Sequence, residues 1–289
     1  MNEKHPWLTI QRGDAPLIVS IPHSGTEIPE TIERDLVSPW LARKDADWWV
    51  EKLYDFAVDL DATIVRTAIS RTVIDVNRDP SGKSLYPGQA TTEMCPTTTF
   101  DGEPLYKKGA NPPDATQIVA RRLHYFDPYH EAIADEIARL RSFHERVVLF
   151  EAHSIRSHAP RLFEGELPQF NIGTNSGAAC ARELAQTVEA VCAASPWTRV
   201  TDGRFKGGWT TRHYGEPALG VHAIQLELAC RGYMDEPKKF TEKTWPTPWS
   251  EPRAAAMRGI LRAMLQGCIK FADTGHAYIA TPSVELSPA

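Results

Sequence analysis

Val147-Val148-Leu149-Phe150-Glu151-Ala152-His153-Ser154 is the most informative segment of the sequence, because it joins an apolar strand to a chemically reactive end. Four consecutive apolar residues, two of them β-branched, indicate a strand buried on both faces. Glu151, His153 and Ser154 then place polar and ionisable groups at the carboxyl end of this strand. Since open α/β sheets bind their ligands beyond the carboxyl ends of their strands, we expect part of a functional site here.

A second segment repeats this arrangement near the N-terminus. The apolar run Leu17-Ile18-Val19-Ser20-Ile21 is followed by Pro22-His23-Ser24-Gly25. Two buried strands that each end in His-Ser would bring His23 and His153 to one edge of a parallel sheet. This pair is the first indication of a metal site or a hydrolytic centre.

Further strands and helices alternate along the chain, which is typical of an α/β domain around a mostly parallel sheet. The helical pattern of 115–143 is interrupted at Asp127-Pro128, which predicts two helices or one kinked helix. We interpret residues 1–289 as a single catalytic domain. The other predicted elements are strands at 62–69, 73–78, 171–175 and 221–229 and helices at 42–60, 177–194 and 250–271.

Residues 79–113 are rich in Gly, Pro and Thr and contain few periodic apolar residues. A long segment without helices or strands inside a compact domain usually has a function of its own. We therefore predict that residues 79–113 form a lid or a binding loop.

The composition excludes several classes of protein. Hydrophobic residues make up 42% and charged residues 24%, with a net charge of −5 and no basic block, which argues against a nucleic-acid partner. The sequence contains no run of about 18 apolar residues, so we predict no membrane span. The N-terminus lacks the pattern of a secretory signal. The five cysteines include no Cys-x-x-Cys pair, so we expect free thiols in a reducing cytoplasm.

The two histidines suit a metal ion. Hydrolytic zinc has three protein ligands and one open position for water. With His23 and His153 as two ligands, a carboxylate from Glu27, Asp45 or Asp47 could be the third. The alternative is that each histidine makes only structural hydrogen bonds.

Glu227 lies inside the otherwise apolar strand Ile224-Gln225-Leu226-Glu227-Leu228. Burial disfavours the charged form of a carboxyl group and raises its pKa, which suits a general base near neutral pH. The alternative is a structural ion pair with an arginine.

Several donors could bind an anionic substrate. Arg71, Arg78 and Arg212 flank strand ends or glycine-rich loops, where a guanidinium can hold a carboxylate through two hydrogen bonds. Asn77 precedes Arg78, and Tyr214 shares the loop of Arg212. We therefore expect a small-molecule substrate that carries carboxylates.

Several motifs together resemble the N-formylglutamate amidohydrolase family. The resemblance extends from about Leu17 to Asp235, and the order of the motifs is the same. The motifs are Ile21-Pro22-His23-Ser24-Gly25, Asp45-Ala46-Asp47-Trp48, the run Ser70–Arg78 and Glu151-Ala152-His153-Ser154. Leu85-Tyr86-Pro87-Gly88, the run Leu162–Pro168 and Asn171-Ile172-Gly173-Thr174 resemble the deformylase branch of the family.

The resemblance implies a three-layer α/β/α fold of the zinc-carboxypeptidase type and hydrolysis of N-formyl-L-glutamate to formate and glutamate, a step in bacterial histidine degradation. It implies His23, Asp47 and His153 as ligands of Zn²⁺ or another divalent metal. Asn77-Arg78 would grip a substrate carboxylate, and Glu227 would be the general base.

The chemistry of these residues agrees with that reading. Zinc would polarise the formyl carbonyl, while Glu227 would take a proton from water and return it to the departing amine. Arg71 would help to hold the oxyanion. Two substrate carboxylates require two cations, for which Arg78 and Arg212 are the candidates.

Three other functions are weighed. The first is hydrolysis of another N-acyl amino acid or of a peptide C-terminus on the same scaffold. The second is carboxylate binding without turnover. A serine hydrolase is disfavoured, because neighbouring residues of a strand point to opposite faces and no Gly-x-Ser-x-Gly motif occurs.

Overall fold

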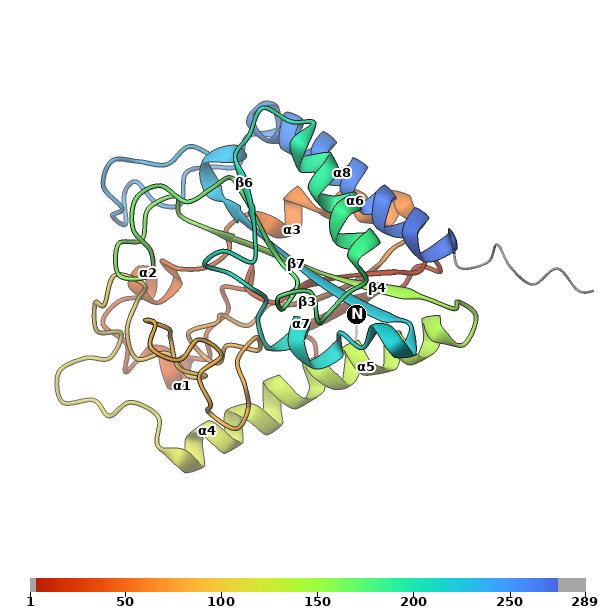
Figure 1. Cartoon of the computed structure of the whole chain (residues 1–289). Coiled ribbons are helices and arrows are strands. Elements are labelled where there is room, and N and C mark those ends of the chain that lie inside the picture. The colour runs from red at the N-terminus through yellow and green to blue at the C-terminus, as the bar shows by residue number, and fades with distance from the viewer. Residues whose placement is uncertain (1–3, 275–289) are drawn as a thin grey trace, which may run out of the picture.

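A mixed seven-stranded sheet forms the centre of the computed structural model, which describes residues 4–274 (Figure 1). Its strand order is β1-β3-β2-β4-β7-β5-β6, and β3, β2, β4 and β7 are mutually parallel. β1 is antiparallel to β3, while β5 is antiparallel to β7 and parallel to β6. The predicted α/β fold with a mostly parallel sheet is confirmed. The strands are β1 (Leu8–Gln11), β2 (Leu17–Ile21), β3 (Thr63–Thr67), β4 (Val147–Ile155), β5 (Phe170–Gly173), β6 (Arg199–Thr201) and β7 (Val221–Ala229).

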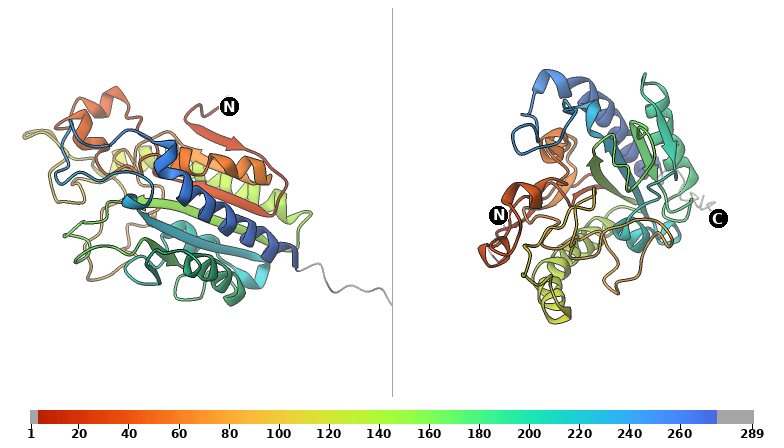
Figure 2. Two further views of the ribbon diagram at one scale, coloured as in Figure 1. Left: turned by 90° about the horizontal axis from the view of Figure 1, so that it is seen from above. Right: turned by 90° about the vertical axis from the view of Figure 1, so that its left-hand side faces the viewer.

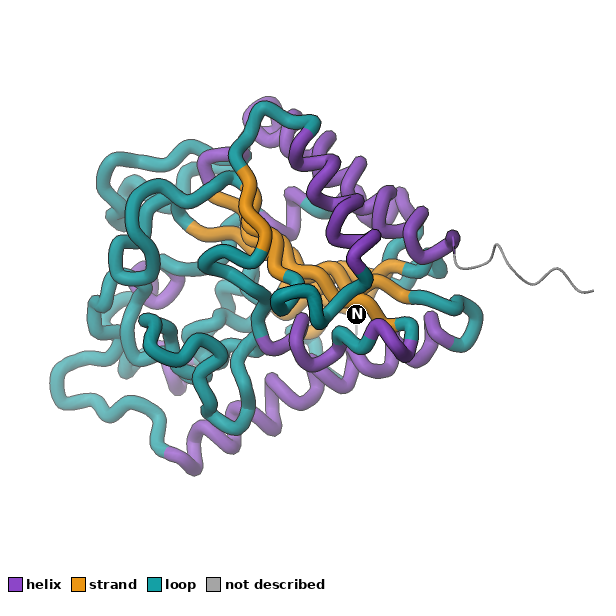
Figure 3. The backbone as a smooth tube through the Cα atoms, viewed as in Figure 1, coloured by secondary structure: helices purple, strands orange, loops and turns teal. Residues whose placement is uncertain are grey.

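Helices cover both faces of this sheet (Figures 1 and 2). α3, α6 and α8 pack on one face, and α5 packs on the other. The long loops gather at one end of the sheet (Figure 3). The helices are α1 (Glu30–Glu33), α2 (Pro39–Arg43), α3 (Val50–Leu53), α4 (Ala115–Arg121), α5 (Asp127–Arg141), α6 (Arg182–Ala193), α7 (Trp209–Tyr214) and α8 (Glu251–Asp273), with 3₁₀ turns at Asp55–Leu60, Pro217–Leu219 and Cys230–Gly232.

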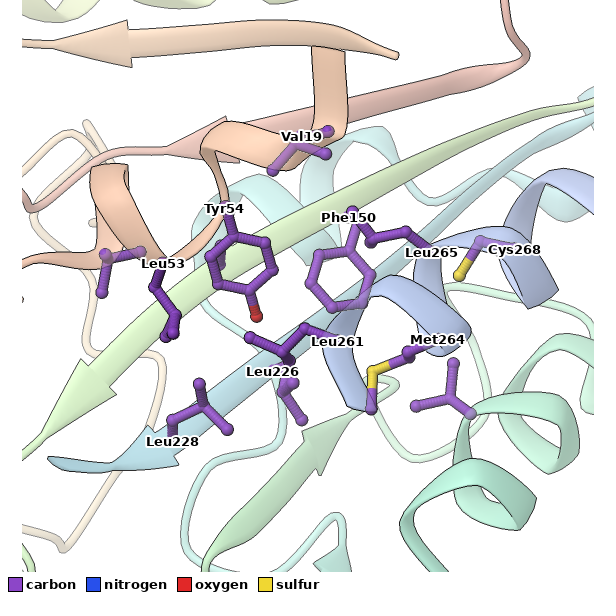
Figure 4. Packing of buried hydrophobic residues seen from close by; sticks show 14 of the residues in the cluster. Val19, Leu53, Tyr54, Phe150, Leu226, Leu228, Leu261, Met264, Leu265 and Cys268 are labelled. Atoms are coloured by element: carbon purple, nitrogen blue, oxygen red, sulfur yellow. The ribbon is translucent and has the colours of Figure 1, made fainter. Parts of the chain in front are cut away.

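The two faces of β4 have different surroundings, because successive side chains of a strand point in opposite directions. Val148, Phe150 and Ala152 belong to the core under α8, which Figure 4 shows from close by. Complete burial of a side chain such as Phe150 contributes about 3 kcal/mol to folding. Val147 and Leu149 lie on the α5 side, and the same row of side chains continues as Glu151 and His153. One strand therefore supplies core residues along both faces and polar groups at its end.

α8 matches the helix predicted at 250–271. One face of it is apolar and buried, with contacts at a spacing of three or four residues. Met257, Leu261, Met264, Leu265 and Cys268 form much of this face.

The prediction of a strand at 73–78 is wrong, because these residues form a buried turn. Their alternating pattern reflects two different environments. Ile74 and Val76 pack in the core on the α5 side. Asp75 and Asn77 instead contact the histidines at the sheet edge, and these contacts hold the backbone in a turn.

The helix predicted at 42–60 is also interrupted, between α2 and α3. Trp49 adopts a left-handed conformation with φ of 65°. The Asp47 amide donates a hydrogen bond to the His23 carbonyl at 3.0 Å. The interruption thus docks Asp47 against the segment that follows β2.

The predicted break at Asp127-Pro128 takes another form. A π-helical turn, Arg122–Phe126, connects α4 to α5 without a loop. Pro128 lies in the first turn of α5, where its missing N–H is tolerated. Residues 79–113 contain no helix and no strand of the sheet, as predicted.

Within residues 4–274, no helix combines the length and the apolarity needed to cross a membrane.

Candidate metal and catalytic site

A cavity of about 590 Å³ lies at the carboxyl ends of β2, β4 and β7. His23 follows β2, while His153 and Glu227 lie near the ends of β4 and β7, and all three line the cavity. Residues 79–95, here named the cavity strap, supply much of the remaining wall. The volume is that of a small-molecule site.

His23, Asp47 and His153 form a buried cluster in which one ligand atom from each residue lies within 4.8 Å of the others. Asp47 Oδ2 is 3.1 Å from Nδ1 of His153 and 3.7 Å from Nδ1 of His23. Two imidazole nitrogens and a carboxylate are a common donor set for hydrolytic zinc. The chemistry and the spacing of these residues therefore fit a divalent cation.

The other nitrogen of each ring faces an acid. His23 Nε2 lies 2.7 Å from Asp75 Oδ1, and His153 Nε2 lies 3.6 Å from Glu151 Oε1. Carboxylates behind metal-binding histidines fix the orientation of the ring and increase its basicity. The cluster therefore has a carboxylate behind each ring: Asp75 is hydrogen-bonded to His23, and Glu151 lies beyond hydrogen-bonding distance of His153.

Charge within the cluster shifts two pKa values. Burial alone would raise the pKa of Asp47, but the hydrogen bond with His153 and the charge of His23 lower it. Burial alone would lower the pKa of His153, but Asp47 and Glu151 raise it to about 10. A proton on His153 is thus stabilised by the same carboxylates that would stabilise a bound cation.

The structure separates the three carboxylates considered from the sequence. Asp47 lies in the cluster, whereas Asp45 pairs with Arg156 at 3.1 Å and accepts a hydrogen bond from the Phe100 amide at 2.6 Å. Glu27 is exposed. Asp47 is therefore the carboxylate that the fold brings to the two histidines.

Glu227 faces the cavity from the centre of the sheet. It is paired in register with His153 on the neighbouring parallel strand, so both side chains project from the same face. Burial raises the pKa of Glu227 to about 8, although the charge of His153 opposes this effect. No arginine forms an ion pair with Glu227 within residues 4–274.

Arg71 lines the cavity and is held by two acids. Its Nη2 is 2.7 Å from Asp75 Oδ2, and its Nη1 is 3.5 Å from Asp47 Oδ1. The guanidinium also stacks over Phe100, 4.8 Å from the ring centroid. These contacts fix the positively charged guanidinium of Arg71 beside the cluster.

Asn77 lines the cavity but uses its amide inside the protein. Its Nδ2 is 3.1 Å from His153 Nε2, and its Oδ1 accepts a hydrogen bond from the Thr210 amide at 2.9 Å. A Cβ atom at Gly208 would lie 2.2 Å from this amide group, so the close approach requires glycine there. These contacts hold the Asn77 amide between His153 and the start of α7.

Arg78 lines the cavity near the same cluster. Its Nη2 lies 3.4 Å from Asp75 Oδ2 and donates to Thr92 Oγ1 at 3.0 Å, and its Nε donates to the Thr92 carbonyl at 3.1 Å. Asp75 is shared with Arg71 and His23. Arg78 therefore has no acid of its own.

The structure does not bring Arg212 and Tyr214 to the cavity wall. Arg212 donates to the Gly207 carbonyl at 2.9 Å and stacks on Tyr86. Tyr214 donates to the His130 carbonyl at 2.9 Å on the α5 side of the sheet. The helix α7 turns both side chains away, and the sequence was interpreted as a loop there.

Arg204 lines the cavity but was not among the site residues predicted from the sequence. It follows the three-residue strand β6, which the sequence analysis did not predict. The available signal was an arginine in the same connection as Gly207 and Gly208.

Comparisons with known proteins support this picture. A family model described as N-formylglutamate amidohydrolase matches residues 15–234. An N-formylglutamate deformylase from Pseudomonas aeruginosa is 43% identical over 271 residues, which cover 93% of this chain and 98% of that protein. One from Pseudomonas putida is 43% identical over 263 residues, which cover 89% and 95% of the two chains.

A crystal structure shows the same fold at lower sequence identity. It is that of an N-formylglutamate amidohydrolase from Ralstonia eutropha JMP134, with a TM-score of 0.76 and 23% identity. The match covers 93% of this chain and 98% of that chain. The resemblance seen in the sequence is therefore confirmed, and the chain belongs to the N-formylglutamate amidohydrolase family.

Proposed function

We propose that this protein hydrolyses N-formyl-L-glutamate to formate and L-glutamate with a divalent metal, most simply Zn²⁺. The observation that carries the proposal is the buried cluster of His23, Asp47 and His153 beside Glu227 in one cavity. Support comes from the two Pseudomonas relatives, which are named N-formylglutamate deformylase.

His23, Asp47 and His153 would hold the metal, and Asp75 and Glu151 would orient the two rings. A divalent cation in this position supplies Lewis acidity toward the formyl carbonyl and toward water. The residues around the cluster would perform the remaining steps.

Glu227 would act as the general base. Its pKa of about 8 lets the carboxyl group exchange protons near neutral pH. It would take a proton from the water that attacks the formyl carbon and return it to the glutamate nitrogen as the C–N bond breaks. Arg71, fixed by two acids, would stabilise the negative oxygen of the tetrahedral intermediate.

Arg78 would hold the substrate α-carboxylate. It lines the cavity and is linked through Asp75 to His23, so it lies on the side of the cavity nearest the reacting amide. Asn77 lines the cavity beside Arg78, and its Nδ2 would help to hold the same carboxylate.

The reaction would complete one bacterial route of histidine degradation in the cytoplasm. A reducing compartment suits the cysteines of residues 4–274, which are all free and buried.

The test is release of the free amino acid by purified protein loaded with one equivalent of Zn²⁺. We expect turnover of N-formylglutamate well above that of N-acetylglutamate, N-formylaspartate and N-formylglutamine, and loss of turnover after chelation. Faster turnover of N-acetylglutamate would favour an enzyme for another N-acyl amino acid. Tight binding without turnover would favour a carboxylate-binding protein.

A further inference from the structure

We propose that Arg204 is the second substrate-binding cation of the cavity and that it binds the side-chain carboxylate of the substrate. This inference rests on the proposed function and adds the residue that would select glutamate over an uncharged analogue. Arg212, which with Arg78 was a candidate for the two carboxylate-binding cations, does not lie on the cavity wall.

A rigid connection positions Arg204. Asp202 adopts a left-handed conformation with φ of 50°, which Asp tolerates better than most residues. Its carboxylate accepts hydrogen bonds from the amide and the hydroxyl of Thr174, and its amide donates to the Ile172 carbonyl at 2.7 Å. These contacts tie the start of the connection to the end of β5, two residues before Arg204.

The guanidinium of Arg204 is oriented by neutral groups. Its Nε donates to the Leu162 carbonyl at 2.7 Å, and its Nη2 donates to the Ala90 carbonyl at 2.8 Å. It stacks on Tyr86 and on Phe205, with the guanidinium carbon 5.3 Å and 5.2 Å from the two ring centroids. The aromatic rings and carbonyls hold the charge in place without neutralising it.

No carboxylate lies within 4.0 Å of Arg204 in the described part of the chain, and its Nη1 donates no hydrogen bond there. An arginine has five N–H donors, so several remain for a ligand. Burial lowers the pKa of Arg204, and the charge of Arg78 lowers it further, although Tyr86 and Glu227 act in the opposite direction. A half-buried guanidinium with unused N–H donors and no paired carboxylate is complementary to an anion.

The two cations would serve different carboxylates. Arg78 is linked through Asp75 to the metal cluster, which suits the α-carboxylate next to the scissile amide. Arg204 contacts Leu162, Tyr86 and Phe205 in another part of the cavity wall. This position suits the carboxylate at the end of the glutamate side chain of the substrate. A substrate with one neutral end would leave a cation unpaired, and a site of this kind discriminates strongly.

The experiment compares Arg204→Met with Arg212→Met on N-formylglutamate and N-formylglutamine. Both arginines stack on Tyr86 and donate to backbone carbonyls, so the pair is matched except for access to the cavity. We expect Arg204→Met to lower kcat/KM for N-formylglutamate by about 100-fold, mainly through KM. We expect its kcat/KM for N-formylglutamine to change less than about threefold, since that substrate has no charge for Arg204 to bind. Turnover of N-formylglutamine also shows that the variant is folded. Arg204→Lys should restore part of the preference, because it keeps the charge but loses the paired donors.

Each outcome decides a different point. A loss of the glutamate preference in Arg212→Met, with the preference kept in Arg204→Met, would overturn the assignment and restore the sequence prediction. Equal losses on both substrates in Arg204→Met would make the residue structural and would also overturn it. If the unaltered protein does not turn over N-formylglutamate, the proposed function fails, and the role of Arg204 fails with it.

Discussion

His153 and Glu227 occupy paired positions on the adjacent parallel strands β4 and β7. A proposed metal ligand and a proposed base are therefore separated by one inter-strand spacing, about 4.8 Å. Loops do not set this distance, since both residues lie within nine-residue strands of the central sheet. The chemistry of the site consequently depends on the pairing of these two strands.

Replacing Glu227 with Gln tests the base. We expect metal content to stay at its original level and kcat to fall by about 100-fold or more, because the amide cannot accept the proton. Glu93→Gln is the matched control, since Glu93 lines the same cavity but is exposed on the strap. Near-normal activity of Glu227→Gln with zinc bound would mean that another group is the base.

The same substitution has a consequence for the stability of metal-free protein. The pKa of Glu227 is about 8 in the folded state against 4.5 ordinarily, so the folded protein binds more protons between these values. Stability from this group is greatest below pH 4.5 and is lost as pH rises to 8, by at most about 1.4 kcal/mol per pH unit. Urea unfolding should show Glu227→Gln gaining stability relative to the parent over this range, with a small difference at pH 4.5. A difference independent of pH would contradict the raised pKa.

Asp75→Asn should weaken metal binding by about 10- to 100-fold, because Asp75 holds the second nitrogen of His23. Arg71 would also lose its closest acid. The measurement is a competition titration of Zn²⁺ with a chromophoric chelator. Asp79→Asn, in the same segment, is the control, since Asp79 accepts a hydrogen bond from the Ser81 amide at 2.8 Å and contacts neither histidine. Equal affinities of the two variants would show that Asp75 does not support the metal.

Metal binding should release protons. In metal-free protein the pKa of His153 is about 10, because the hydrogen bond with Asp47 and the negative charge of Glu151 raise it against the effect of burial. A metal ion that binds His153 must displace the proton that the ring carries. We therefore expect about one proton to be released at pH 7 and the metal affinity to rise with pH. Calorimetric titration in buffers of different ionisation enthalpy measures the number. Heats that do not vary with the buffer would contradict this prediction.

Tyr86→Phe should loosen the cavity strap. The Tyr86 hydroxyl donates to the Gly207 carbonyl at 2.9 Å and accepts from the Lys206 amide at 3.1 Å, and these bonds connect the strap to the loop of Arg204. Phe keeps the ring, so we expect KM for N-formylglutamate to rise about fivefold and proteolysis within residues 79–95 to become faster. Tyr125→Phe, outside the cavity, should change neither. A strap equally resistant to protease in both variants would argue against this anchor.

Much of the sheet could be predicted because its central strands are apolar on both faces. β7 lies at the predicted residues 221–229, and β4 begins at the predicted Val147. The edge strands β1 and β6 were missed, since three or four residues with mixed burial leave little pattern. Arg204 escaped notice for the same reason, because nothing in the sequence marked the strand before it.

The turn at 73–78 shows a different limit. Ile74 and Val76 alternate with Asp75 and Asn77, as in a half-buried strand. Their partners, however, are His23, just after β2, and His153 in β4, which are distant in sequence, and these contacts override the local preference. Asp47 and Asp45 could not be separated from spacing alone, because the break between α2 and α3 decides which one faces His23.

The alternation along β4 also guards against misfolding. If β4 slipped by one residue, Glu151 and His153 would enter the dry layer beneath α8, and Phe150 and Ala152 would face the cavity. Ionisable groups placed in that layer would make the slipped state costly. The ionisable groups of the site therefore also destabilise the wrong register of β4. A chain that pairs these strands wrongly would lose its hydrophobic core as well as its catalytic site.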